Sequence, residues 1–187
     1  MSARRARVLE LAVLGLLYES PLHGYGLRKR LNSELGFFRA FSYGSLYPCL
    51  KRMLRRGHIS QHPEETGFGR TRIVYRLTEA GHQHLHGMLD EVTPAACDDE
   101  SFGVYFALFG HARSDLRLRI LHGRRDRLLT RLKELRSRLA HTADDYLREL
   151  RRHGAESVER EIHWLDGLIA REQRLAALSP SQPGPLG

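Results

Sequence analysis

Apolar residues recur every three or four positions through the first 56 residues, a pattern that predicts three short α-helices. Residues 4–18 are apolar on most sides, so this helix is expected to be central. A second helix is predicted over residues 25–35, with Gly36 as its natural end. Ser42 is a typical N-cap for a third helix, which Gly57 ends. The inner face of this third helix is predicted to consist of Leu46, Leu50, Met53 and Leu54.

The period changes from that of a helix to that of a strand at Ile59. Two stretches alternate between side-chain positions, with a glycine-bearing, partly basic segment between them. The first contains Ile59 and Gln61, and the second contains Ile73, Tyr75 and Leu77. This pattern predicts a β-hairpin. Thr78 then serves as the N-cap of a further helix. The predicted fold is mainly α with a small β-hairpin wing, which in this order is a winged helix-turn-helix.

Residues 94–100 contain a proline, small residues and an acidic cluster, and they mark a predicted domain boundary. Beyond them the chain is strongly charged and helical. A long helix is expected from Ser114 or Asp115 through Tyr146, and Gly154 is expected to interrupt it before a last amphipathic helix. The predicted domains are residues 1–93, a DNA-binding unit, residues 94–178, a helical unit resembling a coiled coil, and residues 179–187, a disordered Pro/Gly/Ser tail.

The net charge of +8 lies in the predicted helix-turn-helix. Residues 1–56 hold eleven Lys and Arg side chains against three glutamates, while the remaining charges cancel. A basic field confined to a small helical module is typical of proteins that bind the phosphate backbone of nucleic acids. Arginine far outnumbers lysine, as a GC-rich genome would give without selection, so the position of the charges carries more weight than their number.

Several function classes receive no support from the sequence. The basic and apolar start resembles a signal peptide, but Glu10 interrupts it and no small-residue cleavage site follows, so a cytoplasmic protein is expected, at the nucleoid when it binds DNA. Cys49 and Cys97 form neither a metal-binding nor a redox spacing and are interpreted as buried thiols. The chain has no Gly-rich phosphate loop and no nucleophile elbow, so no enzyme, no catalytic residue and no cofactor is predicted.

Four motifs, in order, resemble those of the PadR family of bacterial transcriptional regulators. They are Leu14-Gly15-Leu16-Leu17, Pro21-Leu22-His23-Gly24-Tyr25, the run Ser42-Tyr43-Gly44-Ser45-Leu46-Tyr47-Pro48-Cys49-Leu50, and Tyr75-Arg76-Leu77-Thr78-Glu79-Ala80-Gly81. Cys49 stands where the family usually has alanine. The helical C-terminal half resembles the longer subfamily, whose C-terminal domain dimerises. The resemblance implies a sequence-specific, ligand-responsive repressor acting as a homodimer, with a double-stranded DNA operator as its partner and no membrane association.

The third helix is expected to enter the major groove, where its outward side chains reach bases and phosphates. Hydroxyls near its start suit phosphates, and the resemblance implies that Tyr47 contacts the backbone. For each basic residue, the alternative to a DNA contact is an ordinary charge exposed to solvent. A favourable interaction with the helix dipole explains Arg55 nearly as well as a DNA contact does. For Tyr47, the alternative is packing in the core. Pro48 is expected in an early, slightly irregular turn. The predicted DNA-binding residues are Ser42, Tyr43, Ser45, Tyr47, Lys51, Arg52, Arg55, Arg70 and Arg72.

The helices of the C-terminal half carry apolar residues at a spacing of three or four, which we call the apolar seam. This seam is predicted to dimerise, because one chain is not expected to bury it alone. A two-helix hairpin within one chain is the alternative. The predicted dimerisation residues are Leu121, Leu128, Leu132, Leu135, Leu139, Tyr146, Ile162, Leu165 and Ile169.

A small aromatic or planar effector is the last predicted partner, and the resemblance suggests it. Candidate pocket residues are Tyr18, Phe102, Tyr105, Phe106, Phe109 and Trp164, although aromatic residues at helical spacing more often form a core. His82 and His86 share a helix face, but no nearby ligand completes a set, so no metal site is predicted.

Two further functions remain open as alternatives. A non-specific architectural or adaptor protein would use the same basic module without choosing a sequence, and an enzyme with a regulatory N-terminal module has little support. The sequence does not identify the operator, the regulated genes, the effector or the sign of regulation.

Overall fold

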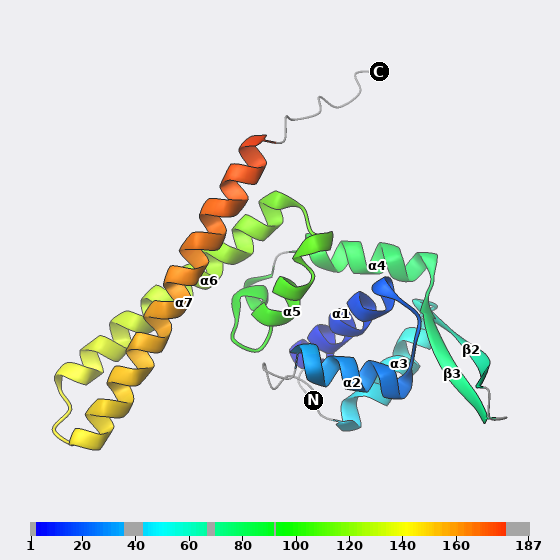
Figure 1. Ribbon diagram of the computed structural model, residues 1–187, viewed down its shortest axis with the longest axis horizontal. Helices are drawn as coiled ribbons and strands as arrows, with labels where there is room; N and C mark the ends of the chain where they lie inside the picture. Colours follow the sequence, from blue (N-terminus) through cyan, green and yellow to red (C-terminus); the bar gives the residue numbers. More distant parts are fainter. Residues whose placement is uncertain (1–2, 36–42, 67–69, 92, 179–187) are drawn as a thin grey trace. The chain divides into compact units, whose positions relative to one another are not determined.

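The computed structural model describes residues 3–35, 43–66, 70–91 and 93–178. The chain forms two compact units, Met1–Ala112 and Arg113–Gly187 (Figure 1). The sequence places the boundary nineteen residues earlier, between 93 and 94, and its predicted tail, 179–187, lies outside the described residues. Within the described parts, no helix has both the length and the apolar character that a membrane crossing requires.

Helix α1 (Ala3–Glu19) is the centre of the first unit. Every residue from Val8 to Leu17 is buried, as a helix that is apolar on most sides requires. Four helices of the unit contact it: α2 (Gly24–Leu35), α3 (Tyr43–Arg55), α4 (Glu79–Asp90) and α5 (Phe102–Ala107). Burial of α1 by these neighbours supplies the core against which α3 is held.

The wing is an antiparallel sheet of three strands in the order β1-β3-β2. Strands β2 (Ile59–Thr66) and β3 (Arg70–Leu77) form the predicted hairpin, in a register that pairs Ile59 with Leu77 and Thr66 with Arg70. The third strand, β1 (Leu22–His23), was not predicted, because two residues are too short to show a period. This sheet and the helices make the fold a winged helix.

Helices α3 and α4 and strand β2 meet where α3 ends. Gly57 has a φ of 72°, the left-handed conformation typical after a helix C-terminus. The carbonyl of His58 accepts a hydrogen bond from the backbone N–H of Thr78 at 3.1 Å. The Thr78 hydroxyl donates to Gly57 O at 2.6 Å and accepts from the N–H of Gly81 at 3.0 Å, the predicted N-cap of α4. This network fixes the end of α3 against the start of α4.

Residues 94–112 belong to the first unit rather than to the C-terminal domain. They form η2 (Pro94–Cys97), α5 and η3 (Phe109–His111). The side chain of Leu108 covers Gly15 of α1 so closely that a Cβ there would meet it at 2.3 Å. Ion pairs of Arg4 with Asp98 and of Arg5 with Glu100 attach the same segment to α1. The acidic cluster that suggested a domain boundary is therefore part of this packed unit.

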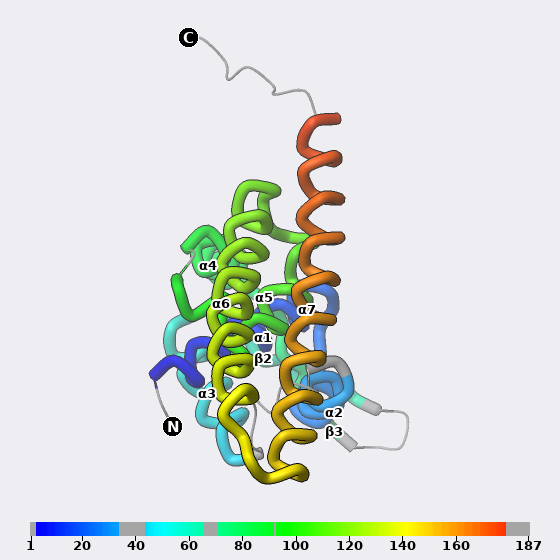
Figure 2. The backbone as a smooth tube through the Cα atoms, turned by 90° about the vertical axis from the view of Figure 1, so that its left-hand side faces the viewer, coloured from blue at the N-terminus to red at the C-terminus, as the bar shows by residue number. Residues whose placement is uncertain are grey.

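The second unit consists of α6 (Ser114–Ala140) and α7 (Asp145–Leu178), which lie side by side (Figure 2). The predicted interruption at Gly154 is wrong, because α7 continues through it. The chain turns instead at residues 141–144, where Asp144 Oδ1 accepts a hydrogen bond from the N–H of Leu147 at 2.7 Å. The Arg148 guanidinium donates to the carbonyls of Thr142 and Ala143, which closes the turn.

The hairpin changes the interpretation of the apolar seam. Most of its residues are buried along the contact of α6 with α7, as the two-helix alternative requires, and they are not exposed for a second chain. Tyr146 is different, since 89% of its surface is exposed just after the turn. The buried seam residues are Leu121, Leu128, Leu132, Ile162, Leu165 and Ile169, whereas Leu135 and Leu139 are half-buried.

Candidate nucleic-acid interface

The exposed face of α3 carries cations and one hydroxyl. Tyr47, Pro48, Lys51 and Arg55 are exposed and follow one another at helical spacing. The opposite face, Leu46, Cys49, Leu50 and Met53, is buried against the unit. The helix therefore presents Tyr47, Lys51 and Arg55 together on one side, as an element that enters a groove must.

Three predictions about α3 need correction. Ser45 is only 8% exposed, because it lies one helical turn before the fully buried Cys49 and shares its face. Arg52 lies on the flank of α3, with one terminal nitrogen, Nη2, buried, since its position turns toward α1 rather than outward. Leu54 is half-buried, and Cys49 takes its place on the inner face. Ser42 and the side chain of Tyr43 lie outside the described residues.

Pro48 and Cys49 lie in the middle of α3. The helix runs through Pro48, which is exposed, rather than starting with an irregular turn there. Proline removes one backbone donor and crowds the carbonyl four residues earlier, which belongs to Gly44 and has no side chain beside it. Cys49 is fully buried, and this burial raises the pKa of its thiol to about 11. The thiol is thus a neutral core group.

A cavity of about 570 Å³ lies between α3, the start of α2 and the wing. Tyr47 is central to it, and a Cβ at Gly24 would meet its hydroxyl at 3.3 Å. The side chains of Tyr25, Arg72 and Tyr75 also line the cavity, and Tyr25 is 65% exposed. Burial, and then the proximity of Tyr47, raises the pKa of Tyr75. Three tyrosines and a guanidinium thus line a recess of mixed polar and apolar surface, where their donor groups can meet phosphate oxygens.

The wing strand β3 carries the two predicted wing arginines. Arg72 is exposed and pairs across the hairpin with Glu64, whose carboxylate lies 3.5 Å from Arg76. Arg70 begins β3, but its side chain lies outside the described residues. The exposed ion pair of Glu64 therefore involves Arg76, and the exposed side chain of Arg72 is placed to meet a phosphate.

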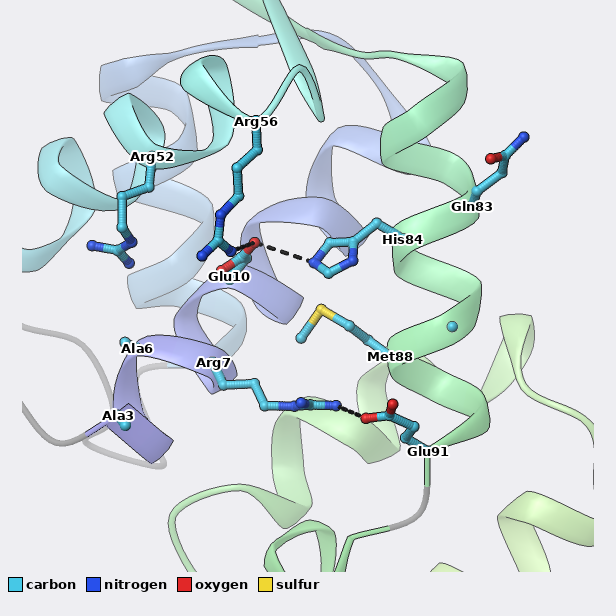
Figure 3. Close-up of a pocket in the computed structure, with 11 residues that line it drawn as sticks. Ala3, Ala6, Arg7, Glu10, Arg52, Arg56, Gln83, His84, Met88 and Glu91 are labelled. Atoms are coloured by element: carbon cyan, nitrogen blue, oxygen red, sulfur yellow. Dashed lines mark hydrogen bonds and ion pairs between the residues drawn. The ribbon is translucent and has the colours of Figure 1, made fainter.

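A second cavity, of about 520 Å³, lies on the other flank of α3 (Figure 3). Arg52 and Arg56 enter it from α3 and its end, opposite Glu10 of α1 and His84 of α4. Glu10 Oε1 lies 3.2 Å from His84 Nε2 and 3.6 Å from Arg56 Nη1. Sequence reasoning missed this cluster, since Glu10 and His84 are far apart along the chain.

The other two histidines of the His82–His86 segment do not face that cavity. The rings of His82 and His86 both contact the ring of Tyr18, with centroids 5.2 and 6.1 Å away. The ring of His111 lies closer, at 4.5 Å. The helical spacing of His82 and His86 therefore places them around an aromatic ring on α1.

The aromatic residues proposed for an effector pocket divide into two sets. Phe102 and Tyr105 are buried in the first unit, as their core alternative requires. Phe106 and Phe109 are half-buried there, with ring centroids 5.0 Å apart. Trp164 belongs to the second unit, where it is 44% exposed.

Residues 13–87 match the family model described as "Transcriptional regulator PadR-like family". This segment of the chain is similar to the PadR-like family. The family is one of transcriptional regulators rather than of enzymes. All four motifs lie in the matched segment, and the structure brings two of them together, because Gly24 of the second leaves room for Tyr47 of the third.

A curated relative is the "Negative transcriptional regulator PadR" of Bacillus subtilis (strain 168), which is 36% identical over 83 residues. The match covers 44% of this chain and 46% of the relative, so the chain matches about half of that protein.

Two crystal structures of Bacillus subtilis PadR are also similar. The one in complex with operator DNA has a TM-score of 0.45 at 23% identity and covers 88% of this chain and 99% of that chain. The one in complex with p-coumaric acid has a TM-score of 0.43 at 22% identity and covers 92% and 98%. The similarity to the PadR-like family rests on the sequence match over residues 13–87.

Proposed function

We propose that this PadR-like protein is a sequence-specific DNA-binding transcriptional repressor that acts as a homodimer. The observation that carries the proposal is the exposed face of α3, where Tyr47, Lys51 and Arg55 lie together beside the wing. A helix presented in this way fits the major groove, and the adjacent wing fits phosphates or the neighbouring minor groove.

Each side chain of this face has a distinct role in the proposal. Lys51 lies about two turns into α3 and reaches the base edges, where a lysine pairs with guanine O6 and N7. Arg55, in the last turn, and Arg72, on the wing, bind phosphates. The Tyr47 hydroxyl donates a hydrogen bond to a phosphate oxygen, next to the cavity that Tyr47 and Arg72 both line. Arg52 takes no direct part, because its guanidinium turns toward α1.

Dimerisation is assigned to the outer face of α7 rather than to the buried seam. Helix α7 has about 3.6 residues per turn, and at this period its exposed and half-buried apolar side chains fall on one face, away from the face that contacts α6. Leu150 is 66% exposed and Leu175 is 44% exposed. Two apolar patches on this face of the 34-residue helix, with His153, Ser157 and Arg160 between them, suit pairing with the same helix of a second copy. The patches consist of Tyr146 and Leu150, and of Trp164, Leu168, Leu175 and Leu178.

Repression and response to an effector complete the proposal. The relative's description as a negative regulator supports repression. A small aromatic or planar molecule is proposed as the effector, with Tyr18, Phe106 and Phe109 of the first unit as candidate contacts. The effector would bind better to a dimer conformation in which the separation of the two recognition helices does not fit the operator, and it would thereby release the DNA.

Competition binding tests the proposal against the architectural alternative. A fluorescent duplex from upstream of the gene is titrated with protein in the presence of excess unrelated duplex. A specific regulator should prefer its site by a factor of about 10³ or more, at two protomers per site. Equal affinity for both duplexes, over several upstream fragments, would favour the architectural function.

A further inference from the structure

Three side chains with metal-ligating atoms converge in the first unit, and none of them belongs to the proposed DNA-binding face. Glu10 comes from the middle of α1, His58 from the connection between α3 and β2, and His84 from α4. Glu10 Oε1 lies 3.2 Å from His84 Nε2 and 3.6 Å from His58 Nδ1, and the three ligand atoms lie within 4.8 Å of one another. The two imidazole rings stack with centroids 4.0 Å apart.

The burial of these groups calls for a partner. Glu10 is 7% exposed, on a helix segment whose other residues form the apolar core, and a carboxylate there is costly without a compensating cation. His58 Nδ1 is buried and has no hydrogen-bond partner, although it faces the carboxylate. A buried nitrogen lone pair beside a buried carboxylate is a donor set for a cation.

We propose that Glu10, His58 and His84 bind a divalent transition metal ion of the Zn²⁺ class. Imidazole nitrogens and a carboxylate are ligands that such an ion prefers over Mg²⁺ or Ca²⁺. In a tetrahedral site with bonds of about 2.0–2.1 Å, neighbouring ligand atoms lie about 3.3 Å apart, close to the two distances from Glu10. The stacked imidazole rings must turn apart to direct both nitrogen lone pairs at one ion, and His84, the more exposed of the two, is the ring that would turn. Three protein ligands leave one position for water, and the adjoining cavity, which Glu10 and His84 line, gives access to it.

The main competitor for Glu10 is the guanidinium of Arg56, which lies 3.6 Å from the same oxygen. Its side chain is 58% exposed, so it can turn into solvent when a metal ion takes its place. Arg56 directly follows α3, and metal binding would therefore free a cation at the end of the proposed recognition helix. This last consequence rests on the proposed function, whereas the metal site does not.

Titration of tag-free protein with Co²⁺ and Zn²⁺ tests the site directly. Visible absorption of four-coordinate Co²⁺, displaced by one equivalent of Zn²⁺, is the expected result. His84→Ala should weaken Zn²⁺ binding by at least about 100-fold, since even outer-sphere substitutions cost 10–100-fold. His86→Ala, two residues along the same helix, is the matched control and should bind as the native protein does. Arg56→Ala should strengthen binding by a factor on the order of ten, because it removes a competing cation.

Circular dichroism of each variant separates lost ligands from lost folding. His84 is one-third exposed, and its replacement should leave the fold intact. The proposal fails if native protein gives only the weak spectrum of six-coordinate Co²⁺, or if folded His84→Ala binds Zn²⁺ as tightly as the native protein. It also fails if His86→Ala, rather than His84→Ala, abolishes binding. These outcomes leave the DNA-binding proposal untouched, because no DNA enters the experiment.

Discussion

Gly81 allows helix α4 to approach the segment that follows α3. A Cβ at this position would lie 2.0 Å from the carbonyl oxygen of His58 and 2.8 Å from Leu77 Cδ1. The first of these atoms belongs to the backbone, which cannot turn away as a side chain can. In Gly81→Ala, α4 and the start of β2 must therefore move apart by about 1 Å, so that the new Cβ reaches the shortest contact that real structures show.

The cost of that separation has three contributions. Overpacking of this kind costs about 1–3 kcal/mol. The hydrogen bond from the Thr78 N–H to the His58 carbonyl, 3.1 Å long, would be strained, at about 1 kcal/mol. Replacing a helical glycine by alanine returns about 1 kcal/mol. The net expectation is a loss of about 1–3 kcal/mol in the free energy of unfolding.

Gly87→Ala is the matched control, since it makes the same change in the same helix. No heavy atom lies within 4 Å of its added Cβ, so only the gain in helix propensity, about 0.5–1 kcal/mol, remains. Urea unfolding followed by circular dichroism should move the midpoint down for Gly81→Ala and up for Gly87→Ala. If both variants were stabilised to the same extent, the close approach of α4 to His58 would be refuted.

Three further predictions concern other parts of the chain. Burial raises the pKa of Cys49 from an ordinary 9.0 to about 11, so the free energy of unfolding should fall as pH rises across that interval, where only the unfolded thiol ionises. Cys49→Ala should reduce this slope in urea titrations at several pH values, and an unchanged slope would contradict the raised pKa. Arg124 is 7% exposed and lies 2.8 Å from a carboxylate of α7, so Arg124→Ala should lower the free energy of unfolding by about 2 kcal/mol. Arg136 forms an exposed pair, and Arg136→Ala should lower it by less than about 1 kcal/mol. Equal losses in thermal unfolding would contradict this. Glutamate at both Leu150 and Leu175 should convert the proposed dimer to a folded monomer in sedimentation equilibrium, and a dimer mass retained by the folded variant would rule out α7 as the contact.

Sequence periodicity was sufficient for the winged helix. The helical repeat of α1, the alternation in β2 and β3 and the N-cap at Thr78 are local signals, and each is present in the structure. Strand β1 has only two residues and could not be seen in this way. Gly154 misled the prediction because glycine is tolerated in an exposed helix, whereas the short-range cap of Asp144 marks the true turn.

The candidate sites were harder to predict, because they depend on which side of a helix a residue faces. Periodicity gave Lys51 and Arg52 similar weight as DNA contacts, and only the tertiary structure turns Arg52 toward α1. The cluster at Glu10 has no sequence signature, since its members come from three segments. In the same way, the apolar seam could be assigned to a dimer or to a hairpin, and sequence spacing is identical for both.

The central claim is that the exposed face of α3 binds DNA. The most direct test is anisotropy of a labelled upstream duplex at several salt concentrations, with native protein, the double variant Lys51→Ala/Arg55→Ala, and Lys133→Ala. The control removes an exposed lysine of α6 in the second unit. The double variant should bind at least about tenfold more weakly, with a salt dependence reduced by about one ion per lost phosphate contact, while Lys133→Ala binds as the native protein does. Equal losses for the double variant and the control, or no loss in either, would contradict the account.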